Sequence, residues 1–215
     1  MRRSPRQRRS RETVDVLLEA AAQVFDRDGL NATTNTIAAR AGYSIGSLYQ
    51  YFADKASIIE TLAVRHVDEG AETVRGILAD ARVNRPPLEE LIASLTEAII
   101  GLHEHRPGLH AVIYRVASRS GVAAQRLEKL EREVIPEIAF HLTEAGRGMP
   151  APERAASAIA TGIDAYLHRV FLLGGDRAEF RRVVSGLVEL HAPAESSAPE
   201  TTARNRDSPG SSIGK

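Results

Sequence analysis

The chain contains no cysteine and no tryptophan, and its 28 basic and 28 acidic residues leave it without formal net charge. The absence of cysteine excludes disulfides and thiolate metal sites. No apolar run approaches the roughly 18 residues that a membrane-spanning helix needs, and no signal-peptide core follows the arginine-rich N-terminus. A chain of 215 residues can bury a sizeable core without covalent staples. These features predict a soluble, cytoplasmic protein.

The charge is unevenly distributed although it sums to zero. Residues 1–11 contain six arginines and no acid, and residues 1–55 contain nine Lys and Arg against six Asp and Glu. This asymmetry predicts a cationic front end on a mildly acidic body. Residues 1–9 are predicted to be a disordered basic arm, which either reaches DNA or only keeps the protein soluble. Residues 193–215 are predicted to be a disordered tail.

Helical periodicity of apolar residues fills the chain between these tails, and no stretch alternates convincingly at period two. The pattern therefore predicts an all-α fold of nine helices. Capping residues, glycines and prolines place them at about 10–28, 34–41, 45–51, 55–82, 88–104, 107–118, 123–146, 152–173 and 177–191.

The most informative segment is residues 33–55, TTNTIAARAGYSIGSLYQYFADK. Two short helices separated by a Gly-containing turn predict a helix-turn-helix. Tyr49, Gln50 and Tyr51 follow one another, so they cannot all face a core. Their polar tips suit phosphates and base edges. The alternative for Tyr49 and Tyr51 is that they only pack against the domain.

Residues 10–60 resemble the N-terminal domain of the TetR family of regulators. The resemblance rests on VFDRDGLNATT, IAARAG and YSIGSLYQYFADK. It implies a three-helix helix-turn-helix DNA-binding domain over residues 10–54, followed over residues 55–192 by a helical effector-binding and dimerisation domain. The DNA contacts that it implies are Thr33, Thr34, Asn35, Ser44, Ile45, Gly46, Ser47, Tyr49, Gln50, Tyr51 and Lys55.

The resemblance also implies different roles for these residues. The residues that open the second short helix would face the major groove, and Gln50 would lie near bases. Tyr49, Tyr51 and Lys55 would bond phosphates, and the free amides of helix N-termini would favour the same groups. The alternative for Lys55 is a solvated lysine at a helix start.

Residues 88–146 carry Leu, Ile and Val at helical spacing. Such helices can form a solid core or enclose an apolar pocket. The resemblance favours an effector pocket, and the residues expected to line it are Leu95, Ile99, His103, His110, Ile113, Tyr114, Val134 and Ile138.

Residues 152–173 are rich in small residues that permit the close approach of another helix, and residues 177–191 offer an apolar stripe. The resemblance implies that these two helices form a four-helix interface between two chains. The residues expected in this dimer interface are Ala155, Ala158, Ile159, Gly162, Ile163, Tyr166, Val184 and Leu187.

No motif indicates catalysis, because the chain lacks a phosphate-binding glycine loop, a nucleophile elbow and a zinc-protease signature. His103 and His105 are two residues apart, which is a poor spacing for a metal-ligand pair on a helix. We therefore expect no enzyme, no cofactor and no metal site.

The sequence predicts a homodimeric, sequence-specific transcriptional regulator that binds double-stranded DNA at a palindromic operator. It is expected to be a repressor that a small apolar or aromatic effector releases. The alternatives are an activator or architectural DNA-binding protein without a small ligand, and a small-molecule-binding enzyme on an all-α fold.

Overall fold

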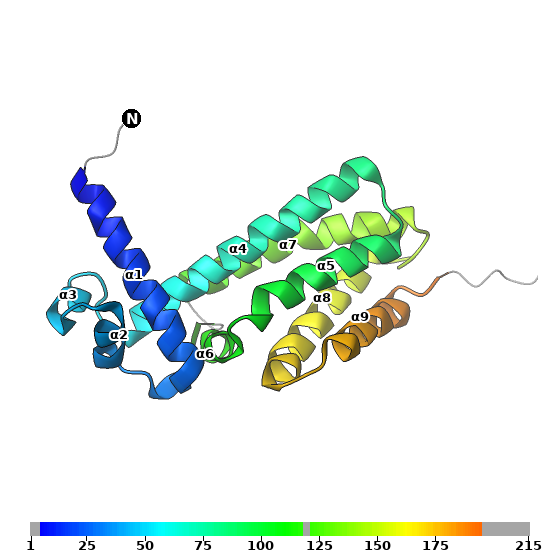
Figure 1. The fold of residues 1–215 in the computed structure, drawn as a ribbon. Helices are drawn as coiled ribbons and strands as arrows, with labels where there is room; N and C mark the ends of the chain where they lie inside the picture. Colours follow the sequence, from blue (N-terminus) through cyan, green and yellow to red (C-terminus); the bar gives the residue numbers. More distant parts are fainter. Residues whose placement is uncertain (1–4, 118–120, 195–215) are drawn as a thin grey trace, which may run out of the picture.

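The computed structural model describes residues 5–117 and 121–194, and this part of the chain is helical (Figure 1). The all-α fold with nine helices is confirmed for these residues. The helices are α1 (Pro5–Asp28), α2 (Thr34–Ala41), α3 (Ile45–Tyr49), α4 (Lys55–Asn84), α5 (Leu88–Glu104), α6 (Pro107–Ala117), α7 (Val122–Glu144), α8 (Pro152–Arg169) and α9 (Arg177–His191). Short 3-10 turns follow α1 (η1, Gly29–Asn31) and α8 (η2, Phe171–Leu173).

Several helix limits differ from the sequence-based expectation, three of them with a structural consequence. α1 begins at Pro5 rather than near Ser10, so part of the expected arm is helical. α3 ends at Tyr49, because the amides of the next two residues bond to carbonyls three residues back, which tightens the last turn. The helix expected over 152–173 divides into α8 and η2. Of the expected arm and tail, residues 1–4 and 195–215 lie outside the described residues.

The short helices are set by side chains next to them in sequence. The hydroxyls of Thr33 and Ser44 accept hydrogen bonds from the amides three residues ahead, at 3.1 Å in both cases. Asp54 begins α4 with a capping box, in which Ser57 bonds back to the Asp54 backbone. Such caps contribute about 1 kcal/mol each. Gly42 ends α2 at a φ of 75°, which only glycine adopts without strain.

The long helix α4 runs from the α1–α3 end of the molecule along its whole body (Figure 1). α5 and α7 lie along it, and α8 and α9 pack beyond them. No helix within the described ranges combines the length and apolarity needed to cross a bilayer.

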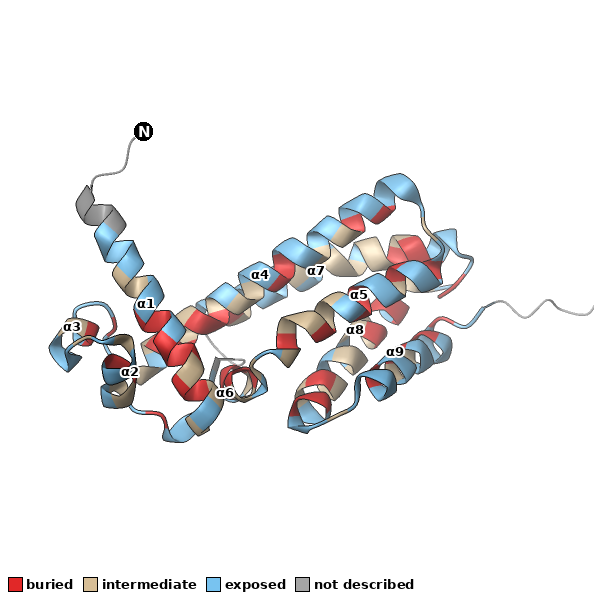
Figure 2. Ribbon diagram, viewed as in Figure 1, coloured by how far each residue is buried: buried red, intermediate tan, exposed pale blue. Residues whose placement is uncertain are grey.

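The largest apolar core contains residues from both sides of the domain boundary that the sequence predicts. It contains residues of α1, α2, α3 and α4, but also Leu109, Val112 and Ile113 of α6 and Ala123 of α7. Figure 2 shows buried residues gathered where α1, α6 and the start of α4 meet. The boundary expected between residues 54 and 55 is therefore crossed by one continuous core.

Polar contacts fix α6 against α1. A carboxylate oxygen of Asp26, near the end of α1, accepts hydrogen bonds from the amides of Gly108 (2.9 Å) and Leu109 (3.3 Å). These amides are unsatisfied within α6 because they lie in its first turn. The Arg106 guanidinium also bonds to the Glu19 carboxylate of α1, which lowers the pKa of Glu19. At Gly108 an added Cβ would lie 2.1 Å from the Asp26 carbonyl oxygen, so the backbones touch.

This close approach predicts opposite effects of alanine at two helical glycines. Gly108→Ala should lower the free energy of unfolding by about 1–3 kcal/mol, because the methyl group forces α6 away from α1. Gly101→Ala in α5 meets nothing within 4 Å and should raise it by up to about 1 kcal/mol through helix propensity. Urea unfolding measures both. Equal effects would show that α6 does not depend on contact with α1.

Candidate DNA-reading surface and ligand cavity

The residues predicted to contact DNA lie on α2, α3 and the start of α4. Of the eleven, eight are exposed, and Thr34, Ser47 and Lys55 are half-buried. The residues between them that hold this surface onto α1 and α4 are buried: Ile37, Ala38, Leu48 and Phe52. The helix-turn-helix therefore exposes a mostly polar set of side chains, together with Ile45.

Tyr49 is the most prominent side chain of that face. It is 51% exposed, so about half of its surface faces solvent. Its hydroxyl lies 3.1 Å from the Thr34 hydroxyl, so one hydrogen bond joins the exposed ends of α2 and α3. Tyr51 is 36% exposed. Two exposed tyrosines thus flank exposed Gln50 in the sequence.

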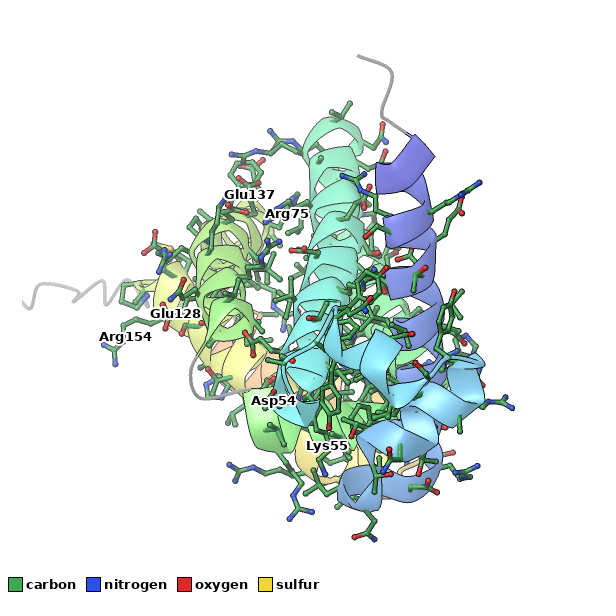
Figure 3. The ribbon with its side chains drawn as sticks, turned by 90° about the vertical axis from the view of Figure 1, so that its left-hand side faces the viewer. Asp54, Lys55, Arg75, Glu128, Glu137 and Arg154 are labelled. Atoms are coloured by element: carbon green, nitrogen blue, oxygen red, sulfur yellow. The ribbon has the colours of Figure 1, made fainter. Side chains whose placement is uncertain are left out.

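Lys55 has a different position from the one expected. Its Nζ atom donates hydrogen bonds to the carbonyl oxygens of Leu30 (2.9 Å) and Ala32 (3.1 Å), at the turn between α1 and α2. Figure 3 shows Lys55 beside Asp54 at the base of α4. In the absence of DNA the ammonium group is therefore bound to the backbone of its own chain. It fixes the turn that carries Thr33 onto α4.

A cavity of about 520 Å³ lies in the body between α4 and α8. This volume is within the range of sites that hold drug-sized ligands. All eight residues expected to line an effector pocket line this one cavity: Leu95, Ile99, His103, His110, Ile113, Tyr114, Val134 and Ile138. The solid-core alternative is therefore wrong. Further apolar lining comes from Val67, Val74, Leu127, Leu130, Ile163 and Leu167.

Histidines gather at one part of the cavity wall. His66 of α4, His103 of α5 and His110 of α6 have ring centroids 4.4–4.8 Å apart. The His168 ring of α8 lies 5.5 Å from that of His103 and stacks on Tyr114 at 4.3 Å. Spacing along the chain does not indicate this cluster, because its members come from separate helices. Of these four histidines, only His103 and His110 are predicted from the sequence to line the cavity.

Burial keeps these three imidazoles neutral. Desolvation lowers the pKa of His66 to about 2, that of His103 to about 4 and that of His110 to about 3. The neighbouring rings add to the shift, since a second positive charge within about 5 Å would repel the first. At neutral pH the cluster therefore offers unprotonated nitrogens.

The charged groups of the cavity wall are acidic. Glu131 and Asp164 line it, and no lysine or arginine does so among the described residues. Burial raises the pKa of Glu131, and the Asp164 carboxylate adds to that shift. Asp164 also lies 3.0 Å from Nδ1 of His168. The cavity is therefore complementary to apolar or cationic groups.

The expected dimer interface needs correction. Ala155, Ile159 and Val184 are buried within a single chain, and Ile163 lines the cavity. They pack there because the apolar stripes of α8 and α9 face the body of their own chain.

The close approach expected of small residues in α8 is also made within the chain. An added Cβ at Gly162 would lie 2.8 Å from a methyl carbon of Leu187. Among the expected interface residues, Ala158, Gly162, Tyr166 and Leu187 remain half-exposed.

Two parts of the chain match known families. Residues 17–62 match the family described as "Bacterial regulatory proteins, tetR family", and residues 87–193 match "Tetracyclin repressor-like, C-terminal domain". The chain is 38% identical over 88 residues to the HTH-type transcriptional repressor KstR2 of Rhodococcus jostii. That match covers 40% of this chain and 43% of the repressor, so it spans less than half of that relative's length.

A longer match is the HTH-type transcriptional activator FasR of Mycolicibacterium smegmatis, 33% identical over 150 residues. It covers 68% of this chain and 65% of FasR. Among solved structures, the regulator FadR from Bacillus subtilis in complex with stearoyl-CoA has the same fold. The TM-score is 0.59 at 20% identity, over 80% of this chain and 96% of that one. The helix-turn-helix geometry and these matches agree: the chain belongs to the TetR family of DNA-binding transcriptional regulators.

Proposed function

We propose that the protein is a homodimeric repressor that binds a palindromic operator and leaves it when an apolar effector occupies the cavity. The observation that carries this proposal is the double role of α6. Its residues Leu109 and Val112 belong to the core under the DNA-reading helices, and His110 and Tyr114 of the same helix line the cavity. A ligand that displaces α6 must therefore disturb the C-terminal end of α1.

Two connections support this coupling. Asp26 of α1 holds the first turn of α6, so the two helices move together. α4 lines the cavity with His66 and Val67, and its first residue, Lys55, holds the turn before α2. Allostery requires two sites and an element that both of them bias. α4 and α6 are such elements.

The volume and lining of the cavity favour a ligand with a large hydrocarbon or fused-ring part. Its lining is mostly aliphatic, and its acidic groups do not complement an anionic head group inside it. FadR, named above, binds stearoyl-CoA. By analogy, we propose that the apolar part of a fatty acyl or similar ligand fills the cavity and that any strongly anionic part stays outside.

The test is a screen of fatty acids, acyl-CoA thioesters and apolar aromatic compounds for thermal stabilisation. Operator DNA is first selected from a random library and is expected to be two-fold symmetric. A stabilising ligand should then weaken operator binding by about 5–150-fold, the usual range of coupling, and DNA should weaken ligand binding equally. A ligand that raises DNA affinity would favour an activator. One that stabilises the protein without changing DNA affinity would contradict the coupling.

Gln50 and Lys55 should behave differently as alanine variants. Gln50 is exposed on the reading face, so Gln50→Ala should reduce discrimination between bases by about 1–3 kcal/mol and leave unfolding unchanged. Lys55→Ala removes two charge-assisted hydrogen bonds and should lower the free energy of unfolding by about 1.5–3 kcal/mol. Binding to a panel of operator variants and urea unfolding measure the two effects. Unchanged base preference in Gln50→Ala would exclude it as a base reader.

The dimer is proposed to form through the outer faces of α8 and α9, where Leu190 is 71% exposed. Gly186 of α9 is exposed, and a side chain there meets nothing in its own chain within 4 Å. Gly186→Arg should therefore yield folded monomers that bind an operator far more weakly, since each holds one half-site.

The matched control is Gly76→Arg in α4, which is also exposed and open. It should remain dimeric. Sedimentation of both variants decides the question: a dimeric Gly186→Arg protein would move the interface away from α9.

A further inference from the structure

The three clustered histidines bring three possible metal-donor nitrogens close together. One ring nitrogen from each of His66, His103 and His110 lies within 4.8 Å of the other two. The Nε2 atoms of His66 and His103 are 3.1 Å apart. Two nitrogens bound tetrahedrally to zinc at about 2.0–2.1 Å lie roughly 3.4 Å from each other. The first pair therefore already has nearly the required separation.

The hydrogen bond behind His103 fixes which of its nitrogens is free. Its Nδ1 atom lies 2.8 Å from the carbonyl oxygen of Ile99, and a carbonyl can only accept. Nδ1 therefore carries the hydrogen, and Nε2 of the neutral ring presents a lone pair toward His66. A backbone carbonyl that orients the second nitrogen is the usual support of a metal-bound imidazole.

His110 provides the second, independent observation. The residue is only 7% exposed, and its Nδ1 atom is buried without a hydrogen-bond partner. Buried polar atoms are almost always paired, so this one needs an explanation. A simple network of packed histidines leaves it unsatisfied. A cation between the three rings satisfies it, and bonds to the ion replace the hydrogen bond that His66 Nε2 donates to His103 Nε2.

We propose that His66, His103 and His110 bind one divalent transition-metal ion of the zinc type, with the remaining coordination position open to the cavity. Imidazole suits Zn²⁺, Ni²⁺ and Cu²⁺, and three protein ligands with one open position are typical of sites that accept a further ligand. A ring nitrogen of His110 completes the set, within 4.8 Å of the other two donor atoms.

The surroundings favour a cation. Asp164 and Glu131 line the same cavity and add negative charge, while no basic side chain lines it among the described residues. His168, 5.5 Å from His103 between ring centroids, is held by Asp164 and is not needed as a ligand. The proposal does not depend on the regulatory function, because metal binding is measured without DNA or effector.

The experiment uses the full chain, freed of metal with EDTA and then of EDTA by gel filtration. Co²⁺ is titrated while the visible ligand-field absorption is followed, and Zn²⁺ is then added as a competitor. One equivalent of Co²⁺ should bind with the intense absorption of a tetrahedral site, and Zn²⁺ should displace it. No binding, or only the weak absorption of hydrated octahedral Co²⁺, would overturn the proposal.

Variants locate the site. His66→Asn, His103→Asn and His110→Asn should each weaken Co²⁺ binding by about 100-fold or more, since even outer-shell changes cost 10–100-fold. The matched control is His141→Asn, because His141 is also buried with an unpartnered ring nitrogen but lies outside the cavity. Equal loss in the control would overturn the assignment.

A measurement on the unaltered protein covers the case in which a variant does not fold. X-ray absorption of the Zn²⁺-loaded chain counts the imidazole ligands directly. Three histidine nitrogens at about 2.0 Å are expected. Two or fewer would overturn the proposal.

Discussion

The contact between the first turn of α6 and the end of α1 is the constraint on which the rest of the structure depends. Gly108 brings the two backbones together, and the Asp26 carboxylate satisfies amides that a helix start would otherwise leave free. Since α6 also forms part of the cavity wall, this contact packs the DNA-binding helices α1–α3 and the rest of the chain into one unit. In this member of the TetR family, residue 54 is therefore not a simple hinge between two separate domains.

Local features of the fold could be predicted from sequence because their causes are local. Thr33, Ser44 and Asp54 cap the helices that they precede, and Gly42 ends α2. The cavity lining followed from helical periodicity, since apolar residues on one face of each helix must meet in the middle of a bundle. Periodicity did not by itself distinguish a cavity from a solid core; the resemblance supplied that distinction.

The errors came from contacts between distant parts of the chain. The small residues of α8 indicate a close neighbour, but sequence does not say whether that neighbour is α9 of the same chain or a partner. At Gly162 it is Leu187 of the same chain. Lys55 was expected to bond a phosphate, and nothing in the sequence indicates the carbonyl partners that it has more than twenty residues earlier in the chain. The histidine cluster joins three helices, so no spacing rule could reveal it.

The length of α4 has a mechanical consequence. Its 30 residues span about 45 Å, and the cavity borders the middle of the helix around Gly70. A tilt of only about 5° at that point would displace the Lys55 end by about 2 Å, since some 22 Å of rigid helix lies between them. In this geometry a small tilt in the body becomes a shift approaching the length of a hydrogen bond at the end of α4 that adjoins the helix-turn-helix. The proposed coupling between the cavity and the DNA-reading helices therefore needs no unfolding of the chain.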